Sequence, residues 1–253
     1  MLRGLKRSVG RRLQRLGNDW VRSTGHDNSP SDLEAISDLF AFVRPFTMTS
    51  RERVFALRSA VEYVIGSEIP GAIVECGVWK GGSMMAVAKT LMEKGTQRTL
   101  YLFDTFDGMT EPSDADKDFR GVSATERLRH ADRNTSLMWG YSPLDEVKNN
   151  IRKTGYDEQL CVFVEGRVEQ TIPDRAPPEI ALLRLDTDWY ESTSHEMQHL
   201  FPRLSVGGVL LIDDYGHWQG ARKAVDQYLT ENEVKLLLHR IDYTGRIGIK
   251  LQA

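Results

Sequence analysis

Four aspartates, Asp186, Asp188, Asp213 and Asp214, stand in two pairs, and each pair directly follows an apolar run of strand length. Like charges that are brought close repel one another unless a cation or a shared proton compensates them. No Cys or His stands at ligand spacing, so this all-oxygen set suits Mg²⁺ better than Zn²⁺. The two pairs therefore indicate a magnesium site, provided that the two strands are neighbours.

A glycine-rich turn, Glu75 to Ser83 (ECGVWKGGS), links another apolar run to a helical pattern. Glycines such as Gly77 let the backbone approach a ligand, and the free amides of a helix N-terminus bind a carboxylate or a phosphate. The spacing departs from G-x-G-x-x-G and no Gly-Lys-Ser/Thr triplet is present, which disfavours dinucleotide and P-loop sites. The alternative is a turn that only packs strand against helix.

Asp104 ends the next apolar run, where an acidic residue can accept hydrogen bonds from both ribose hydroxyls of a nucleoside. The alternative is that Asp104 caps the loop that follows. Capping explains Asp107 better, because it stands beside Gly108. His217 comes shortly after Asp214 and is either structural or an acceptor contact.

From Gly71 onward, strand-length runs alternate with helical patterns, which predicts a doubly wound, mostly parallel α/β sheet of seven strands. The expected strands cover residues 72–76, 99–103, 161–164, 180–185, 209–212, 234–238 and 246–251. The expected helices cover residues 82–93, 143–153 (capped by Ser142), 192–204 and 218–229. The last two strands are joined through Asp242 to Gly245 with no helix between them, so a hairpin makes the last strand antiparallel. Such sheets bind ligands beyond the carboxyl ends of their strands, where the aspartates stand.

Two further helices are expected before the sheet. Ser31 or Asp32 caps the first, which ends before Pro45, and Thr49 or Ser50 opens the second. Residues 106–142 show no core pattern, and a loop of this length in a compact domain is typical of a lid.

The chain has 253 residues with 40% hydrophobic residues, enough for a core, and its net charge of -3 gives no reason to expect nucleic acid as a partner. Residues 1–22 carry a net charge of +6, which leaves -9 on the rest. Apolar residues recur every three or four positions (Leu2, Leu5, Val9, Leu13 and Leu16), which makes this segment a basic amphipathic helix that could contact an anionic membrane or a partner, or only pack as an extension. We expect residues 1–30 to be this extension and its linker, and residues 31–253 to be the main domain.

No apolar run is long enough to span a bilayer, and no apolar signal region follows the basic N-terminus. The protein is therefore expected in the cytoplasm, with peripheral contact at the inner membrane surface through residues 1–22. Cys76 and Cys161 are expected to be reduced and buried.

Four ordered segments of the chain resemble the macrocin O-methyltransferase family, whose members methylate sugar hydroxyls of antibiotics. The segments are VECGVWKGG from Val74, DTFDG from Asp104, LRLDTDWYEST from Leu183 and GGVLLIDDYG from Gly207. The resemblance covers about residues 45–250. Thr187 departs from it, because glycine is expected between the two aspartates, and residues 1–30 match nothing in the family.

The resemblance implies a methyltransferase that uses S-adenosylmethionine and Mg²⁺. Carried over by position, the metal ligands are Asp186, Asp213 and Asp214, and the general base is Asp188. The cofactor-binding positions are Glu75, Gly77, Ser83, Asp104, Gly166 and Val168, with Gly166 and Val168 bordering the adenine.

The acceptor is expected to be a glycosylated small molecule or a glycan, and the protein a homodimer. Catechol O-methyltransferases share the three metal positions, so a small phenol or catechol stays an alternative acceptor. A second alternative is a non-catalytic module that binds the cofactor and docks on a partner through residues 1–22.

Overall fold

The computed structural model describes residues 31–133 and 135–252. The chain divides into two compact units, Met1–Ala35 and Ile36–Ala253. The basic helix predicted over residues 1–22 lies outside the described residues, and the predicted domain division at residue 30 stays a prediction. The sheet belongs to the second unit.

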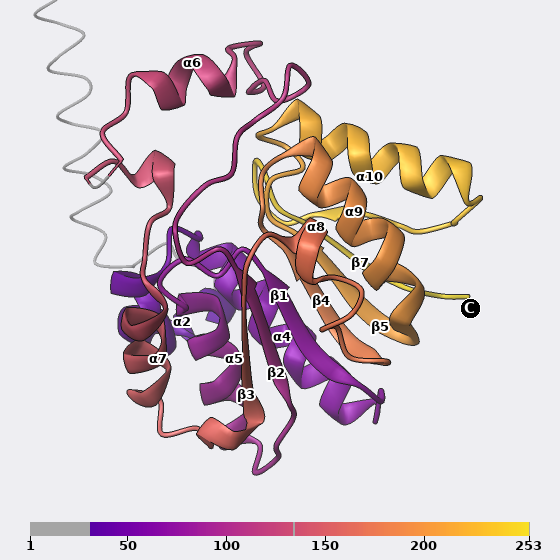
Figure 1. The fold of residues 1–253 in the computed structure, drawn as a ribbon. Coiled ribbons are helices and arrows are strands. Elements are labelled where there is room, and N and C mark those ends of the chain that lie inside the picture. Colours follow the sequence, from indigo (N-terminus) through magenta and orange to yellow (C-terminus); the bar gives the residue numbers. More distant parts are fainter. Residues whose placement is uncertain (1–30, 134, 253) are drawn as a thin grey trace, which may run out of the picture. The chain divides into compact units, whose positions relative to one another are not determined.

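Seven strands form one sheet in the order β3-β2-β1-β4-β5-β7-β6 (Figure 1). They are β1 (Ala72–Cys76), β2 (Leu100–Asp104), β3 (Cys161–Glu165), β4 (Ile180–Leu185), β5 (Leu204–Ile212), β6 (His239–Arg240) and β7 (Arg246–Ile249). The first five run parallel, whereas β7 is antiparallel to both β5 and β6. This confirms the predicted fold class. The strand order reverses beside β1, which has β2 on one side and β4 on the other, so the binding crevice is expected at the carboxyl ends of these strands.

Helices cover both faces of the sheet (Figure 1). The described helices are α2 (Ser31–Glu34), α3 (Ser37–Val43), α4 (Arg51–Gly66), α5 (Gly82–Glu93), α6 (Ala124–Arg129), α7 (Leu144–Arg152), α8 (Val168–Thr171), α9 (Tyr190–Leu200) and α10 (Gln219–Glu231). Successive strand residues point to opposite faces, so Ile73 packs in the core under α3, α4, α5 and α7, and Val74 in the core under α8, α9 and α10. Burial on both faces is the reason why these strands are apolar throughout.

Three expectations about local structure are corrected. The first predicted helix is broken between α2 and α3, because the backbone leaves helical geometry at Ile36 (φ -104°, ψ 10°). Residues 234–238 form no strand. Val234, Leu236 and Leu238 pack against the core that α10 covers, whereas Leu237 is exposed, and the N–H of Val234 bonds to the carbonyl of Leu229 at the helix end. Ser142 does not cap α7 but donates a hydrogen bond to Glu146, since Pro143 takes the N-cap position.

The predicted lid has a small core, which its own sequence does not reveal. Ala124 and Leu128 of α6 pack with Trp189 and Trp218, whose rings meet edge to face at 4.9 Å between centroids. The two tryptophans follow β4 and β5, far from the lid in the sequence. The lid is therefore anchored on the loops that carry the four aspartates.

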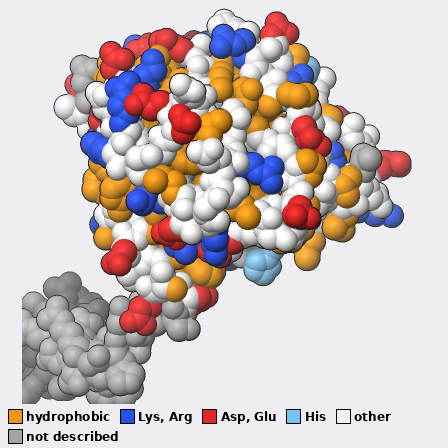
Figure 2. Space-filling view, turned by 90° about the horizontal axis from the view of Figure 1, so that it is seen from below, with side chains coloured by type: hydrophobic (Ala, Val, Ile, Leu, Met, Phe, Trp, Pro, Cys, Tyr) orange, Lys and Arg blue, Asp and Glu red, His pale blue; other side chains and the backbone are white. Residues whose placement is uncertain are grey.

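Within residues 31–133 and 135–252, no helix combines the length and the apolar character needed to cross a bilayer. On the face drawn in Figure 2, basic and acidic side chains of the described residues are interspersed. Cys76 is buried and Cys161 half-buried, and both are free thiols.

Candidate functional site

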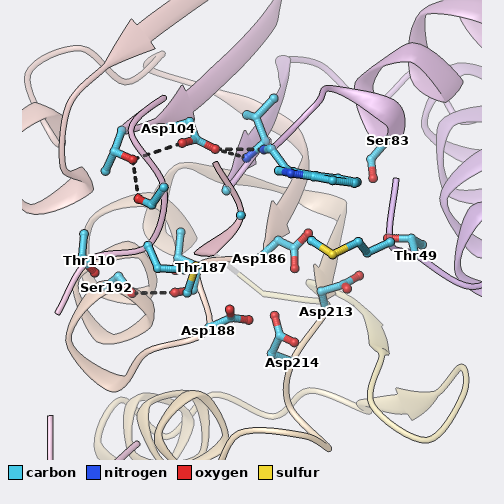
Figure 3. Close-up of a pocket in the computed structure, with 18 of the residues that line it drawn as sticks. Thr49, Ser83, Asp104, Thr110, Asp186, Thr187, Asp188, Ser192, Asp213 and Asp214 are labelled. Atoms are coloured by element: carbon cyan, nitrogen blue, oxygen red, sulfur yellow. Dashed lines mark hydrogen bonds between the residues drawn. The ribbon is translucent and has the colours of Figure 1, made fainter. Parts of the chain in front are cut away.

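A cavity of about 300 Å³ opens where the parallel strands end (Figure 3). Nine of the ten predicted site residues line this cavity; the exception is Glu75. Leu185 of β4 is in register with Ile212 of β5, so the loops that follow start side by side. The neighbouring strand ends thus bring the four aspartates together, as the sequence predicts.

Three of the aspartates form one group. Asp186, Asp188 and Asp214 each present a carboxylate oxygen, and these oxygens lie within 4.8 Å of one another. Oδ2 of Asp214 is buried and has no hydrogen-bond partner. A buried oxygen without a partner beside two other carboxylates fits a bound divalent cation, which prefers such oxygen ligands.

The electrostatics of this group support the same conclusion. Burial raises the pKa of Asp188 to about 7, although a hydrogen bond with Asp214 opposes the rise. Burial also raises the pKa of Asp186 and Asp214 well above their usual range, and Asp213 adds to both shifts. The three carboxylates therefore resist being charged together until a positive charge joins them.

Asp213 faces away from the group, towards two arginines. One of its oxygens accepts a hydrogen bond from Arg53 of α4, and the other lies 2.5 Å from Nη2 of Arg184. The predicted ligand set contained Asp213 and placed Asp188 outside it as the base. The geometry of this structure instead groups Asp188 with Asp186 and Asp214, and the roles of Asp188 and Asp213 stay predictions.

Arg184 is the buried centre of an ion-pair network that the sequence reasoning missed. Its Nη1 lies 2.5 Å from Oε1 of Glu75 and 2.6 Å from Oδ2 of Asp186, and its Nη2 also donates to Thr49. Arginine is rarely buried unless it is paired. A signal was available, because Arg184 is a charged residue inside the otherwise apolar strand β4.

Replacing Arg184 is expected to destabilise the fold. Arg184→Met leaves the buried carboxylates around it without their counter-charge, so we expect the free energy of unfolding to fall by about 3–5 kcal/mol, measured by urea denaturation. The control is Arg222→Met, which breaks an exposed pair with Asp226 and should cost less than about 1 kcal/mol. Equal losses in the two variants would contradict this role.

Glu75 lies below the cavity rather than in its wall. Its side chain is 1% exposed, one oxygen bonds to Arg184, and Oε2 has no partner. Burial raises the pKa of Glu75 to about 7, although the Arg184 guanidinium opposes the rise. In this structure Glu75 therefore supports Arg184, and its predicted contact with a cofactor stays a prediction.

The glycine-rich turn brings backbone close to the aspartate loop. Gly77 has φ +83°, and a Cβ there would lie 2.0 Å from the carbonyl oxygen of Asp186. Gly81, at φ +88°, is the N-cap of α5, and the side chain of Ser83 in the first turn is buried against the cavity. The amides at this helix start are the groups that the sequence predicted would bind a ligand.

Asp104 caps two turns in this structure. Its carboxylate accepts hydrogen bonds from the amides of Val78 (2.6 Å), Trp79 (3.0 Å) and Phe106 (2.8 Å). The capping alternative is thus what the contacts show, although Asp104 also lines the cavity. Gly166, whose N–H bonds to the carbonyl of Asp104, lines the cavity beyond β3 with Val168.

The lid and the last hairpin complete the wall on the side of the aspartates. Leu137 and Met138 of the lid line the cavity, as do His217 and Tyr243, with Tyr243 Oη 3.3 Å from Nδ1 of His217. Trp139 of the lid does not line the cavity, and its indole N–H donates to the carbonyl of Ala131. His217 therefore stays a candidate acceptor contact.

Comparisons with known proteins identify the family. The model of the macrocin O-methyltransferase family matches residues 18–247, so the match begins within residues 1–30, where no likeness to the family was expected. A tetracenomycin-type 4'-O-methyltransferase from Streptomyces olivaceus is 34% identical over 200 residues, which are 79% of this chain and 73% of that protein. The demethyldecarbamoylnovobiocin O-methyltransferase of Streptomyces niveus is 32% identical over the same shares.

Among solved structures, that of the O-methyltransferase NovP superposes with a TM-score of 0.72 at 30% identity, over 82% of this chain and 83% of that one. The similarity thus extends from the sequence motifs to the fold that positions them. The chain belongs to the macrocin O-methyltransferase family and is an O-methyltransferase.

Proposed function

We propose that this protein transfers a methyl group from S-adenosylmethionine to a sugar hydroxyl of a glycosylated small molecule. The observation that carries the proposal is the group of carboxylates of Asp186, Asp188 and Asp214 in a cavity that a glycine-rich turn also lines. The relative from Streptomyces olivaceus is named for methylating a rhamnosyl tetracenomycin, which supports a sugar acceptor.

S-adenosylmethionine fits the end of the cavity between the glycine-rich turn and the β3 loop. There we place its amino-acid end against Gly77 and Ser83, its ribose beside Asp104 and its adenine beside Gly166 and Val168. The free amides at the start of α5 would bind the methionine carboxylate. The aspartates lie at the other end of this arrangement, where the acceptor must enter (Figure 3).

Mg²⁺ is the proposed metal, held by Asp186, Asp213 and Asp214. The buried, unpartnered oxygen of Asp214 and the nearby carboxylate oxygen of Asp186 fit this ion. Asp213, whose oxygens bond to Arg53 and Arg184 in this structure, would have to turn towards the ion. When bound, a divalent cation lowers the pKa of a coordinated hydroxyl and orients it. Arg184 contacts both Asp186 and Asp213, so it holds two of the three carboxylates at a fixed separation.

Asp188 is the proposed general base. A carboxylate with a pKa of about 7 is a better proton acceptor near neutral pH than an ordinary aspartate. The acceptor hydroxyl gives its proton to Asp188, and its oxygen bonds to the methyl carbon as the carbon–sulfur bond breaks. The products are a methyl ether and S-adenosylhomocysteine, and Asp188 passes its proton to solvent.

A methyl-transfer assay tests this function. The full-length protein is incubated with Mg²⁺, S-adenosylmethionine labelled in the methyl group, and three acceptor classes: aromatic deoxysugar glycosides, nucleotide sugars and catechols. We expect label in the sugar of the glycosides. Label in catechols alone would favour the phenol alternative, and cofactor binding without transfer to any acceptor would favour the interaction module.

Residues 1–22 are proposed to hold the enzyme at an anionic membrane surface inside the cell. Each basic residue near the headgroups contributes on the order of 1 kcal/mol, and salt weakens this attraction. Deleting residues 1–22 should abolish sedimentation with anionic vesicles at low salt and leave turnover on a soluble glycoside unchanged. If the full-length protein does not sediment, the segment instead serves the proposed homodimer, which light scattering of both proteins would detect.

A further inference from the structure

Asp188 lies in a backbone conformation that an aspartate rarely adopts. Its φ is +67°, and the N–H of Trp189 donates to the carbonyl of Thr187 at 2.7 Å. A bond between residues two apart around a positive φ is a γ-turn, which is strained for a residue with a side chain. Such strain persists only where the surroundings fix the turn.

Contacts with Cys76 and Arg184 hold Asp186, whereas Asp188 lies at the centre of the strained turn. The N–H of Asp186 donates to the carbonyl of Cys76 at 2.8 Å, and its carboxylate bonds to Arg184. The carboxylate of Asp188 instead has a hydrogen bond with Asp214 of the same group. The position of Asp188 therefore depends on what holds the residues on its two sides, which are Trp189 and Tyr190, bonded to the lid, and Thr187.

The side chain of Thr187 is tied to Glu196 of α9. Oγ1 of Thr187 lies 3.0 Å from Oε1 and 3.1 Å from Oε2 of Glu196, which is completely buried. Ser192 adds a longer contact, from its hydroxyl to the carbonyl of Thr187 at 3.4 Å. The proposed mechanism gives Glu196 no task, although burying a carboxyl group is costly unless it has a partner.

Glu196 is suited to anchor a loop of aspartates. Burial raises its pKa well above the usual range, which favours the neutral form of this side chain beside the cluster. It sits on α9, which packs against both α10 and β4. The hydrogen bond thus links the loop to a rigid element behind the sheet.

We infer that Thr187 and Glu196 are positioning residues, whose hydrogen bond holds the strained turn that aims Asp188 at the acceptor. The resemblance predicts glycine at position 187, and glycine has no side chain that could bond to Glu196. The hydrogen bond between Thr187 and Glu196 therefore depends on the threonine of this chain. The inference rests on the proposed role of Asp188 as the base.

The test combines amide exchange with kinetics of the full-length protein. Thr187→Val deletes the hydroxyl at nearly constant shape. We expect the amide of Trp189 to exchange with deuterium about tenfold faster, the loss expected for one hydrogen bond. We also expect kcat to fall about 10- to 100-fold while the KM values stay within about threefold, because a misplaced base weakens the transition state and not substrate binding.

Rescue variants separate positioning from general damage. Thr187→Ser and Glu196→Gln keep a hydrogen bond between the two positions and should restore most of kcat, whereas Glu196→Leu should match Thr187→Val. Thr90→Val, which deletes the buried hydroxyl bond to Ala86 in α5, is the control for losing a threonine hydroxyl elsewhere. Adding Glu196→Leu to Thr187→Val should cause little further loss.

Unchanged Trp189 exchange and kcat in Thr187→Val would overturn the inference, as would a serine variant no better than valine. If Thr187→Val does not fold, the comparison of Glu196→Gln with Glu196→Leu decides in the same way. Failure of the proposed function would look different, because the wild-type protein would then transfer no methyl group while the exchange arm still reported on the turn.

Discussion

Asp188→Asn is expected to lower kcat by about 10²- to 10⁴-fold, the usual contribution of a general base. The amide keeps the size of the side chain but cannot accept the hydroxyl proton. Affinity for S-adenosylmethionine, measured by calorimetry, should stay within about threefold, because Asp188 lies with Asp214 at the acceptor end of the cavity. Asp107→Asn is the control, since Asp107 is an exposed aspartate paired with Arg133 on the lid. A fully active Asp188→Asn enzyme would refute the role of base.

The same variant decides between the two roles that the structure leaves to Asp188. If Asp188 is the base, Asp188→Asn should leave the affinity for Mg²⁺ nearly unchanged. If Asp188 is a metal ligand, the substitution should weaken that affinity as much as Asp214→Asn does. Asp213→Asn gives the converse test, because Asp213 bonds to Arg53 and Arg184 in this structure. Calorimetric titration of the three variants with Mg²⁺, in the presence of S-adenosylhomocysteine, measures the difference.

Removal of divalent cations is expected to lower turnover by about 10³-fold, since activation of a hydroxyl by a metal is worth several kcal/mol. Without a cation the raised pKa values of Asp186 and Asp214 favour the protonated form of these carboxyl groups, and the acceptor hydroxyl has nothing to lower its own pKa. Turnover is measured after dialysis against a chelator and again after adding Mg²⁺, which should restore it.

Asp214→Asn provides the matched genetic test of the same site, because it alters the buried oxygen that has no partner. We expect this variant to stay inactive at Mg²⁺ concentrations that restore the dialysed wild-type enzyme. Undiminished turnover in excess chelator would exclude the metal from the mechanism.

The sequence predicted the sheet and the meeting of the four aspartates because both follow from local rules. Apolar runs define the buried parallel strands, and the carboxyl ends of neighbouring parallel strands lie at one edge. It did not predict how the carboxylates pair, since Arg53 comes from a helix 160 residues before Asp213 in the chain. The core of the lid was not predicted for the same reason, since Trp189 and Trp218 contribute to it from outside the lid.

The lid is bonded to the residues that directly follow Asp188. The indole N–H of Trp189 donates to the carbonyl of Thr110 in the lid at 3.0 Å, and the amide of Tyr190 donates to Asp116 of the lid at 2.8 Å. The lid and the loop that carries Asp188 are thus one mechanical unit. A change of the lid during evolution would then also change the contacts that hold Trp189 and Tyr190. A new acceptor preference would therefore require compensating substitutions at the turn that carries Asp188.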